Sequence, residues 1–205
     1  MYKLKPTLQT LVYLWGKSSL LFASSVEVNF YRSKFNTHIT NYSKEVTLDR
    51  VIISGLLNYY LVVICSFLDE WNNEFTPNNH KEFSGRILQL KKYTKPILKR
   101  INQWSGIKDF RNIILAHNLR EKGGESVFNP DSKVDFNKPV SSNDYLLINN
   151  LLNALMKYTL TEFQDVKLEL DKSLGDYVKV NTESDESNDE VINILIEVEK
   201  LKNDY

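Results

Sequence analysis

Apolar residues recur every three or four positions along most of this chain, the spacing of one helical face rather than the alternation of a β-strand. The chain also holds only seven glycines and five prolines in 205 residues, few for a protein built from tight turns. The pattern predicts helices over about residues 7–31, 47–75, 81–104, 107–120, 141–170 and 191–202. We therefore expect an all-α protein, an up-and-down bundle of four to five main helices.

Local signals mark where several of these helices begin, end or bend. The first helix either continues through Gly16 or breaks there, and residues 76–79 favour a turn. Pro96 removes a helical hydrogen-bond donor, so it must kink or split the helix over 81–104. Ser105 is placed to cap the next helix, and Ser141 opens a capping box with Asp144.

The end of the chain differs in composition from the rest. Residues 1–175 are expected to form the bundle, and residues 176–205 an acidic linker followed by a short amphipathic helix. The segment 181–190 is acidic and of low complexity, which is typical of a linker.

A stretch of eighteen residues without charge, 51–68, reaches the lower length limit of a membrane-spanning helix. Polar residues interrupt it and charged residues lie directly beyond both ends, so a central helix buried by its neighbours has the same pattern. The lone cysteine, Cys65, lies in this stretch and is expected to be a buried small hydrophobe. We expect a soluble, cytoplasmic protein with no membrane partner.

The net charge of zero hides a strong segregation of charge along the chain. Residues 81–122 carry eleven basic and three acidic residues, whereas residues 161–205 carry five basic and thirteen acidic ones. A basic block of this kind suits a polyanionic ligand such as RNA. Ordinary lysines on a solvated helix face would give the same count, so the block alone does not decide.

Within the basic block, the apolar helical run 110–118 contains Arg111, Asn112 and His117. An imidazole exchanges protons near neutral pH, and a guanidinium binds a phosphate through two hydrogen bonds. Residues six apart on a helix lie on neighbouring faces about 9 Å apart along the axis, so one helix does not direct both side chains at one atom. Two copies facing each other across a twofold axis would, which makes a homodimer necessary if the site is real.

The order arginine, polar residue, four residues, histidine in a helical bundle resembles the motif of HEPN domains, the higher eukaryotes and prokaryotes nucleotide-binding family. The stretch 110–118 is most similar to HEPN proteins of abortive-infection and toxin systems, and residues 67–71 are similar to a less distinctive segment of that group. The resemblance implies a metal-independent endoribonuclease of a toxin–antitoxin or phage-defence system, acting as a homodimer, without a cofactor and with a possible antitoxin partner. Some relatives carry a modified tyrosine just before the histidine, but Ala116 stands there in this chain.

The same resemblance implies roles for individual residues. His117 would move the proton of the ribose 2′-hydroxyl or of the leaving oxygen, Arg111 would stabilise charge on the scissile phosphate, and Asn112 would position a reacting group. The product would carry a 2′,3′-cyclic phosphate, so DNA should not be cut. Four basic residues are expected to contact the phosphate backbone of RNA: Lys99, Arg100, Lys108 and Arg120.

The alternative is a catalytically inactive helical interaction protein. In that case His117 would pack at a helix end and Arg111 would pair with Asp69, Glu70 or Asp109. Asp69 and Glu70 could orient Arg111, or they could be surface residues near a helix end. We favour the surface position.

Other chemistries have little support in the sequence. The three histidines lie far apart and lack cysteine or carboxylate neighbours at ligand spacing, so no metal site is expected. The pair Gly123-Gly124 lacks the further glycines and the lysine of a phosphate-binding loop.

The acidic segment 182–190 is expected to compete with RNA for the basic face, and deletion of residues 181–205 should then raise RNA affinity at low salt.

Overall fold

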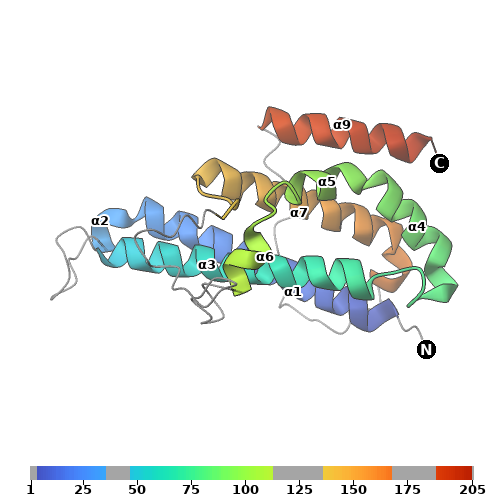
Figure 1. Ribbon diagram of the computed structural model, residues 1–205, viewed down its shortest axis with the longest axis horizontal. Coiled ribbons are helices and arrows are strands. Elements are labelled where there is room, and N and C mark those ends of the chain that lie inside the picture. The colour runs from blue at the N-terminus through green and yellow to red at the C-terminus, as the bar shows by residue number, and fades with distance from the viewer. Residues whose placement is uncertain (1–3, 36–46, 113–135, 168–187, 205) are drawn as a thin grey trace, which may run out of the picture.

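The computed structural model describes residues 4–35, 47–112, 136–167 and 188–204, and this part of the chain is helical with no β-strand. The all-α prediction is therefore confirmed, and the helices form a bundle (Figure 1). The α-helices are α1 (Leu4–Phe30), α2 (Arg32–Phe35), α3 (Leu48–Asp69), α4 (Ser84–Tyr93), α5 (Lys95–Ile101), α6 (Ile107–Phe110), α7 (Ser142–Glu162) and α9 (Asp189–Asn203). A π-helical turn (Glu70–Glu74) follows α3, and a short 3-10 helix (Lys81–Phe83) precedes α4.

Two long helices, α1 and α3, lie side by side, and α2 stands at the outer end of this pair (Figure 1). Helix α7 contacts α1, α4 and α5, while α9 lies along α4 and α5 at the edge of the molecule (Figure 1). The short helix α6 lies against α3 (Figure 1). This arrangement places residues 110–112, the described start of the candidate motif, beside the end of α3.

The core is one cluster of apolar side chains to which all the long helices contribute. Its largest fully buried side chain, Trp71, lies between Phe67 and Phe75. Trp15 and Trp104 are buried as well, and the indole nitrogen of Trp15 donates a 2.8 Å hydrogen bond to Asn153 Oδ1. All three tryptophans therefore lie in the core.

The cysteine prediction is also confirmed, because Cys65 is fully buried. The C-terminal helix joins the same core through Val191 and Val198, both fully buried. The predicted boundary at residue 175 lies outside the described residues and stays a prediction.

Helix ends follow the local signals at most positions. Helix α1 continues through Gly16, and the capping box of Ser141 and Asp144 is present. The predicted helix 81–104 is split at Thr94, with Pro96 in the first turn of α5, where its missing N–H is not needed.

The predicted N-cap at Ser105 is wrong. Gly106 stands at that position of α6, and no side chain forms a capping hydrogen bond. The reason is tertiary: Gly106 N donates a 2.8 Å hydrogen bond to Asn137 O, and a Cβ atom on Gly106 would lie 2.6 Å from Asn137 N. The backbone of the segment 136–138 therefore packs against this turn and sets its conformation.

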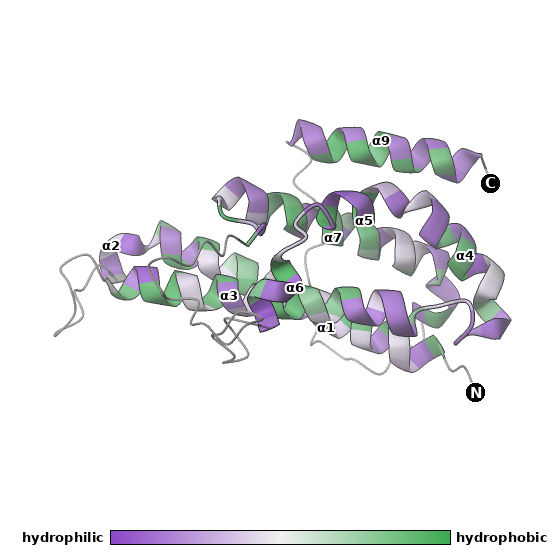
Figure 2. Cartoon of the chain, in the orientation of Figure 1, coloured by the Kyte–Doolittle hydropathy of each residue, from purple (hydrophilic) through white to green (hydrophobic). Residues whose placement is uncertain are grey.

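Among the described residues, one helix, 48–74, is long and apolar enough to cross a membrane by length and composition alone. Hydrophobic residues continue along α3 to its outer end (Figure 2). Its inner half fills the core through residues such as Leu61 and Ile64, as a central helix of a bundle does.

Candidate functional site

Arg111 and Lys108 meet at one carboxylate, Asp69, the last residue of α3. Lys108 Nζ lies 2.7 Å from Asp69 Oδ1, and Arg111 Nη1 lies 3.0 Å from Asp69 Oδ2. The two cations are three residues apart, so the helical start of the motif segment directs both to the same side. Asp69 lies at a helix end with its side chain 34% exposed, as we favoured, and its carboxylate is also a direct partner of Arg111, which was the alternative.

Asn112 completes this arrangement. Arg111 Nε donates a 3.1 Å hydrogen bond to Asn112 Oδ1. Two edges of the guanidinium are therefore held, one by the carboxylate and one by the amide, and its plane is fixed. We call Asp69, Lys108, Arg111 and Asn112 the Arg111 cluster.

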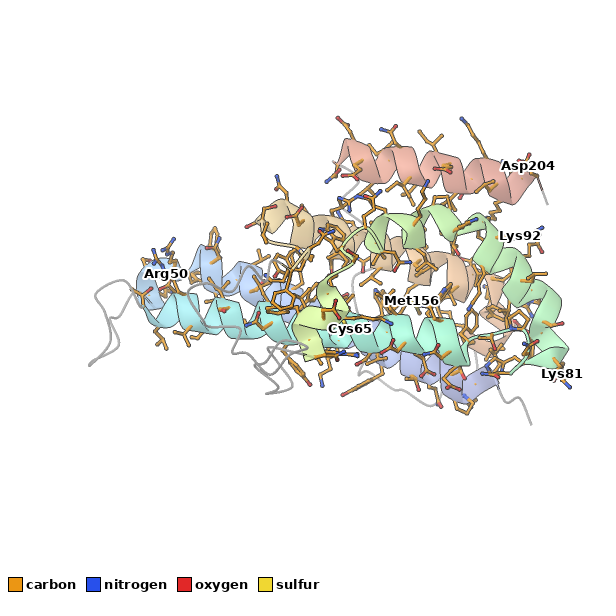
Figure 3. All side chains as sticks on the ribbon, in the orientation of Figure 1. Arg50, Cys65, Lys81, Lys92, Met156 and Asp204 are labelled. Atoms are coloured by element: carbon orange, nitrogen blue, oxygen red, sulfur yellow. The ribbon has the colours of Figure 1, made fainter. Side chains whose placement is uncertain are left out.

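The charge of the Arg111 cluster is positive overall, with two cations around one carboxylate. Partial burial alone would raise the pKa of the Asp69 carboxyl, but the hydrogen bonds from Lys108 and Arg111 outweigh burial and lower this pKa. Asp69 therefore stays ionised at neutral pH and remains paired with both cations. Cys65, one turn earlier on α3 and labelled in Figure 3, has its thiol pKa raised by burial, which does not suit a thiol nucleophile.

Two contacts with the segment 136–138 hold the end of α6 in place, in addition to the hydrogen bond of Gly106 before its start. The rings of Phe110 and Phe136 meet edge to face with centroids 5.5 Å apart. Lys138 Nζ lies 4.7 Å from the centroid of Phe110. The residue directly before Arg111 is thus held by one aromatic ring and one ammonium group.

On the other side of Asp69, the π-helical turn carries Glu70 and Trp71. Burial, followed by the charge of Glu74, raises the pKa of Glu70, and no hydrogen bond to the Arg111 cluster is formed by this carboxyl in the described chain. Lys91 Nζ donates a 2.7 Å hydrogen bond to Trp71 O, and burial lowers the pKa of Lys91 to about 8. Lys91 was not singled out from the sequence, since nothing local shows that this lysine of the basic block turns inward.

The residues predicted to contact RNA lie in different parts of the structure. Lys108 belongs to the Arg111 cluster, whereas Lys99 and Arg100 lie on α5 under the C-terminal helix. Arg100 Nε pairs with the Glu190 carboxylate, and its guanidinium lies 4.2 Å from the centroid of Trp104. Arg120 and His117 lie outside the described residues, as do 113–119 of the predicted helix 107–120.

The contact between α9 and α5 shows which residues could take part in the expected competition between the acidic tail and RNA. Lys99 and Arg100 share a pocket of about 440 Å³ with Glu190 and Glu197. Because Val191 and Val198 bury themselves in the core, α9 is attached to the basic helix by apolar contacts as well as by charge. Deleting residues 181–205 would uncover that core, so a change of charge alone is the cleaner test.

We expect Glu190→Gln to bind RNA up to about fivefold more tightly at low salt, since a partly exposed ion pair contributes at most about 1 kcal/mol and its loss frees Arg100 for a phosphate. Fluorescence anisotropy with a labelled RNA measures the change. Glu199→Gln is the matched control, because Glu199 lies on the same helix but bonds the Tyr158 hydroxyl. Equal affinities for Glu190→Gln and the unsubstituted protein would remove α9 as a competitor.

Comparison of the chain with protein families, with characterised proteins and with solved structures finds no match. The described residues contain no group of three histidine, cysteine or acidic side chains that could hold a metal ion.

Proposed function

We propose that this chain is a metal-independent endoribonuclease of the HEPN type, acting in a toxin–antitoxin or phage-defence system. The observation that carries the proposal is the fixed guanidinium of Arg111, held by Asp69 and Asn112 next to Lys108. A cation whose orientation is set before the substrate arrives stabilises developing charge without reorganising during the reaction. Arg111 and Asn112 occupy the arginine and polar positions of the motif that the sequence resembles.

The proposed reaction is transesterification of RNA. His117 removes the proton of a ribose 2′-hydroxyl, and the 2′-oxygen attacks the adjacent phosphorus. The bond from phosphorus to the 5′-oxygen breaks, and that oxygen takes up a proton as it leaves. Arg111 stabilises the negative charge that accumulates on the phosphoryl oxygens. The products are a 2′,3′-cyclic phosphate and a 5′-hydroxyl, and no metal takes part.

The homodimer belongs to this proposal because one helix does not bring Arg111 and His117 to one phosphate. Their six-residue separation puts them on neighbouring faces about 9 Å apart along an ideal helix. An isologous dimer would place the arginine of one copy opposite the histidine of the other. A protein antitoxin is the proposed regulator of such a cleft.

The second candidate is a catalytically inactive interaction protein. It is favoured by the pairing of Asp69 with both Lys108 and Arg111, since ion pairs of this kind also occur as simple structural contacts. The outer part of the α1 and α3 pair also leaves apolar side chains exposed, among them Leu20 and Phe30, which suits a protein partner.

Incubation of purified protein with a mixed-sequence RNA in EDTA, alongside His117→Ala, separates the two candidates. We expect cleavage by the unsubstituted protein alone, with cyclic-phosphate ends and no cleavage of DNA of the same sequence. Equal cleavage by both proteins would place the activity elsewhere or in a contaminant. No cleavage by a folded dimer would favour the interaction protein.

A further inference from the structure

Lys17 of α1 lies between two exposed tyrosines, where α1 and α3 run side by side (Figure 1). Its Nζ atom is 4.8 Å from the centroid of the Tyr59 ring on α3 and 5.6 Å from the centroid of the Tyr13 ring on α1. Tyr13 is 56% exposed and Tyr59 is 45% exposed, so the group faces solvent. We call Tyr13, Lys17 and Tyr59 the Lys17 triad.

Hydrogen bonds within the Lys17 triad leave several donors around one nitrogen atom. The hydrogen bond to the Tyr59 hydroxyl, supported by a second one to Tyr13, raises the pKa of Lys17 although burial lowers it, so the ammonium stays charged at neutral pH. An ammonium has three N–H donors, and a phenol oxygen that accepts a hydrogen bond keeps its own O–H to donate. One N–H and two O–H groups of the triad can therefore donate to a ligand at the same place.

The two helices that carry the Lys17 triad present no competing carboxylate beside it. Lys17 forms no ion pair within the described chain. The one acidic residue of α1, Glu27, is ten residues away, and α3 carries no charge between Arg50 and Asp69. A positive charge with three converging donors suits an anionic oxygen, and lysine and tyrosine side chains both bind phosphate in nucleic-acid complexes.

The exposed side of α3 connects the Lys17 triad to the Arg111 cluster. Tyr59, Val62, Ser66 and Asp69 follow one another at spacings of three or four residues, which places them on one face of the helix. Val62 and Ser66 are partly exposed between the two sites. Ten residues of α-helix span about 15 Å. This is about the length of four stacked nucleotides at about 3.4 Å each.

We propose that the Lys17 triad binds a backbone phosphate of single-stranded RNA, about four nucleotides from the phosphate held at Arg111, with a base stacked on an exposed tyrosine ring. The inference rests on the proposed ribonuclease function and names its substrate as an extended strand that follows α3. Aromatic side chains beside a cation are typical of sites for single strands, whose unpaired bases are free to stack.

The test is fluorescence anisotropy of the full chain with a labelled twelve-nucleotide RNA whose 2′-hydroxyls are methylated, so that it is not cleaved. Lys17→Gln should bind about tenfold more weakly, as expected for loss of a hydrogen bond from a charged group. The slope of log affinity against log salt should fall by about 0.7, the value for one phosphate of a single strand. Tyr59→Ala should also lose about tenfold, from lost stacking, and Tyr59→Phe should lose less because it keeps the ring.

Lys34→Gln is the matched control. Lys34 Nζ lies 4.6 Å from the centroid of the Tyr31 ring at α2, so this variant removes the same charge from a similar aromatic setting outside the Lys17 triad. It should bind the RNA like the unsubstituted protein, and circular dichroism should show all variants folded. If Lys34→Gln weakens binding as much as Lys17→Gln does, the attraction is general and the proposal is overturned.

Failure of this inference and failure of the proposed function give different results. RNA binding that neither Lys17→Gln nor Tyr59→Ala weakens would overturn the inference and leave the function standing. Absence of RNA binding by the unsubstituted protein at about 1 mM would overturn both. Dissociation of a dimer in Tyr59→Ala, seen by sedimentation, with unchanged RNA affinity would overturn the inference and assign the triad to a contact between two copies.

Discussion

Arg111→Ala is expected to lower RNA cleavage by about 10²–10³-fold, the usual cost of removing one preorganised group that stabilises developing charge. Its melting temperature should stay close to that of the unsubstituted protein. The Arg111 side chain is 26% exposed, and Asp69 keeps Lys108 as a partner, so little stability depends on this ion pair. The measurements are initial cleavage rates in EDTA and thermal unfolding of both proteins.

Asp69→Asn separates positioning from chemistry at the same site. The amide keeps the shape of the carboxylate but loses its charge, so Arg111 is held less firmly, and we expect a loss of cleavage smaller than that of Arg111→Ala. Arg86→Ala is the matched control, because Arg86 pairs with Glu162 and Asp165, away from the Arg111 cluster. Full cleavage by Arg111→Ala would rule out the proposed ribonuclease site.

Trp71→Ala is expected to destabilise the protein by about 3–5 kcal/mol, the range for removing a large buried aromatic side chain. Trp71 is fully buried, stacks on Phe67 at an interplanar angle of 15°, and contacts the ring of Phe75 with centroids 5.0 Å apart. A large cavity would remain between the π-helical turn and α4. Urea unfolding followed by circular dichroism measures the loss.

Trp71→Phe serves as the comparison, because it retains an aromatic ring in the same place and should lose clearly less stability. Trp71 also follows Asp69 by only two residues, so the alanine variant should loosen the Arg111 cluster. A destabilisation of Trp71→Ala below about 1 kcal/mol, the size of a surface effect, would show that this core does not pack as described.

The parts of the fold that could be predicted are those governed by short-range physics. The capping box of Ser141 and Asp144 needs only three residues of sequence, and the split near Pro96 follows from its missing N–H. The failed cap at Ser105 shows the limit of such signals. The backbone of Asn137, 31 residues after Gly106, approaches that glycine and determines the turn.

The candidate site was only half visible in the sequence for the same reason. The motif identified Arg111 and Asn112, but Asp69 is 42 residues away from Arg111, and nothing in its own neighbourhood distinguishes it from a surface carboxylate. The segregation of charge predicted attraction between the acidic end and the basic block. It did not predict that Glu190 would pair with Arg100, since this ion pair depends on how α9 packs on α5.

The contacts that pin α6 to the segment 136–138 have a consequence for Arg111, the residue directly after Phe110. Phe110 and Phe136 are in contact, so the two ends of the chain that connects them are held at the same place on the bundle. Arg111 therefore follows a residue that is anchored to the bundle, and its guanidinium meets the Asp69 carboxylate there. A loss of activity in His117→Ala reports on chemistry when its thermal unfolding matches that of the unsubstituted protein.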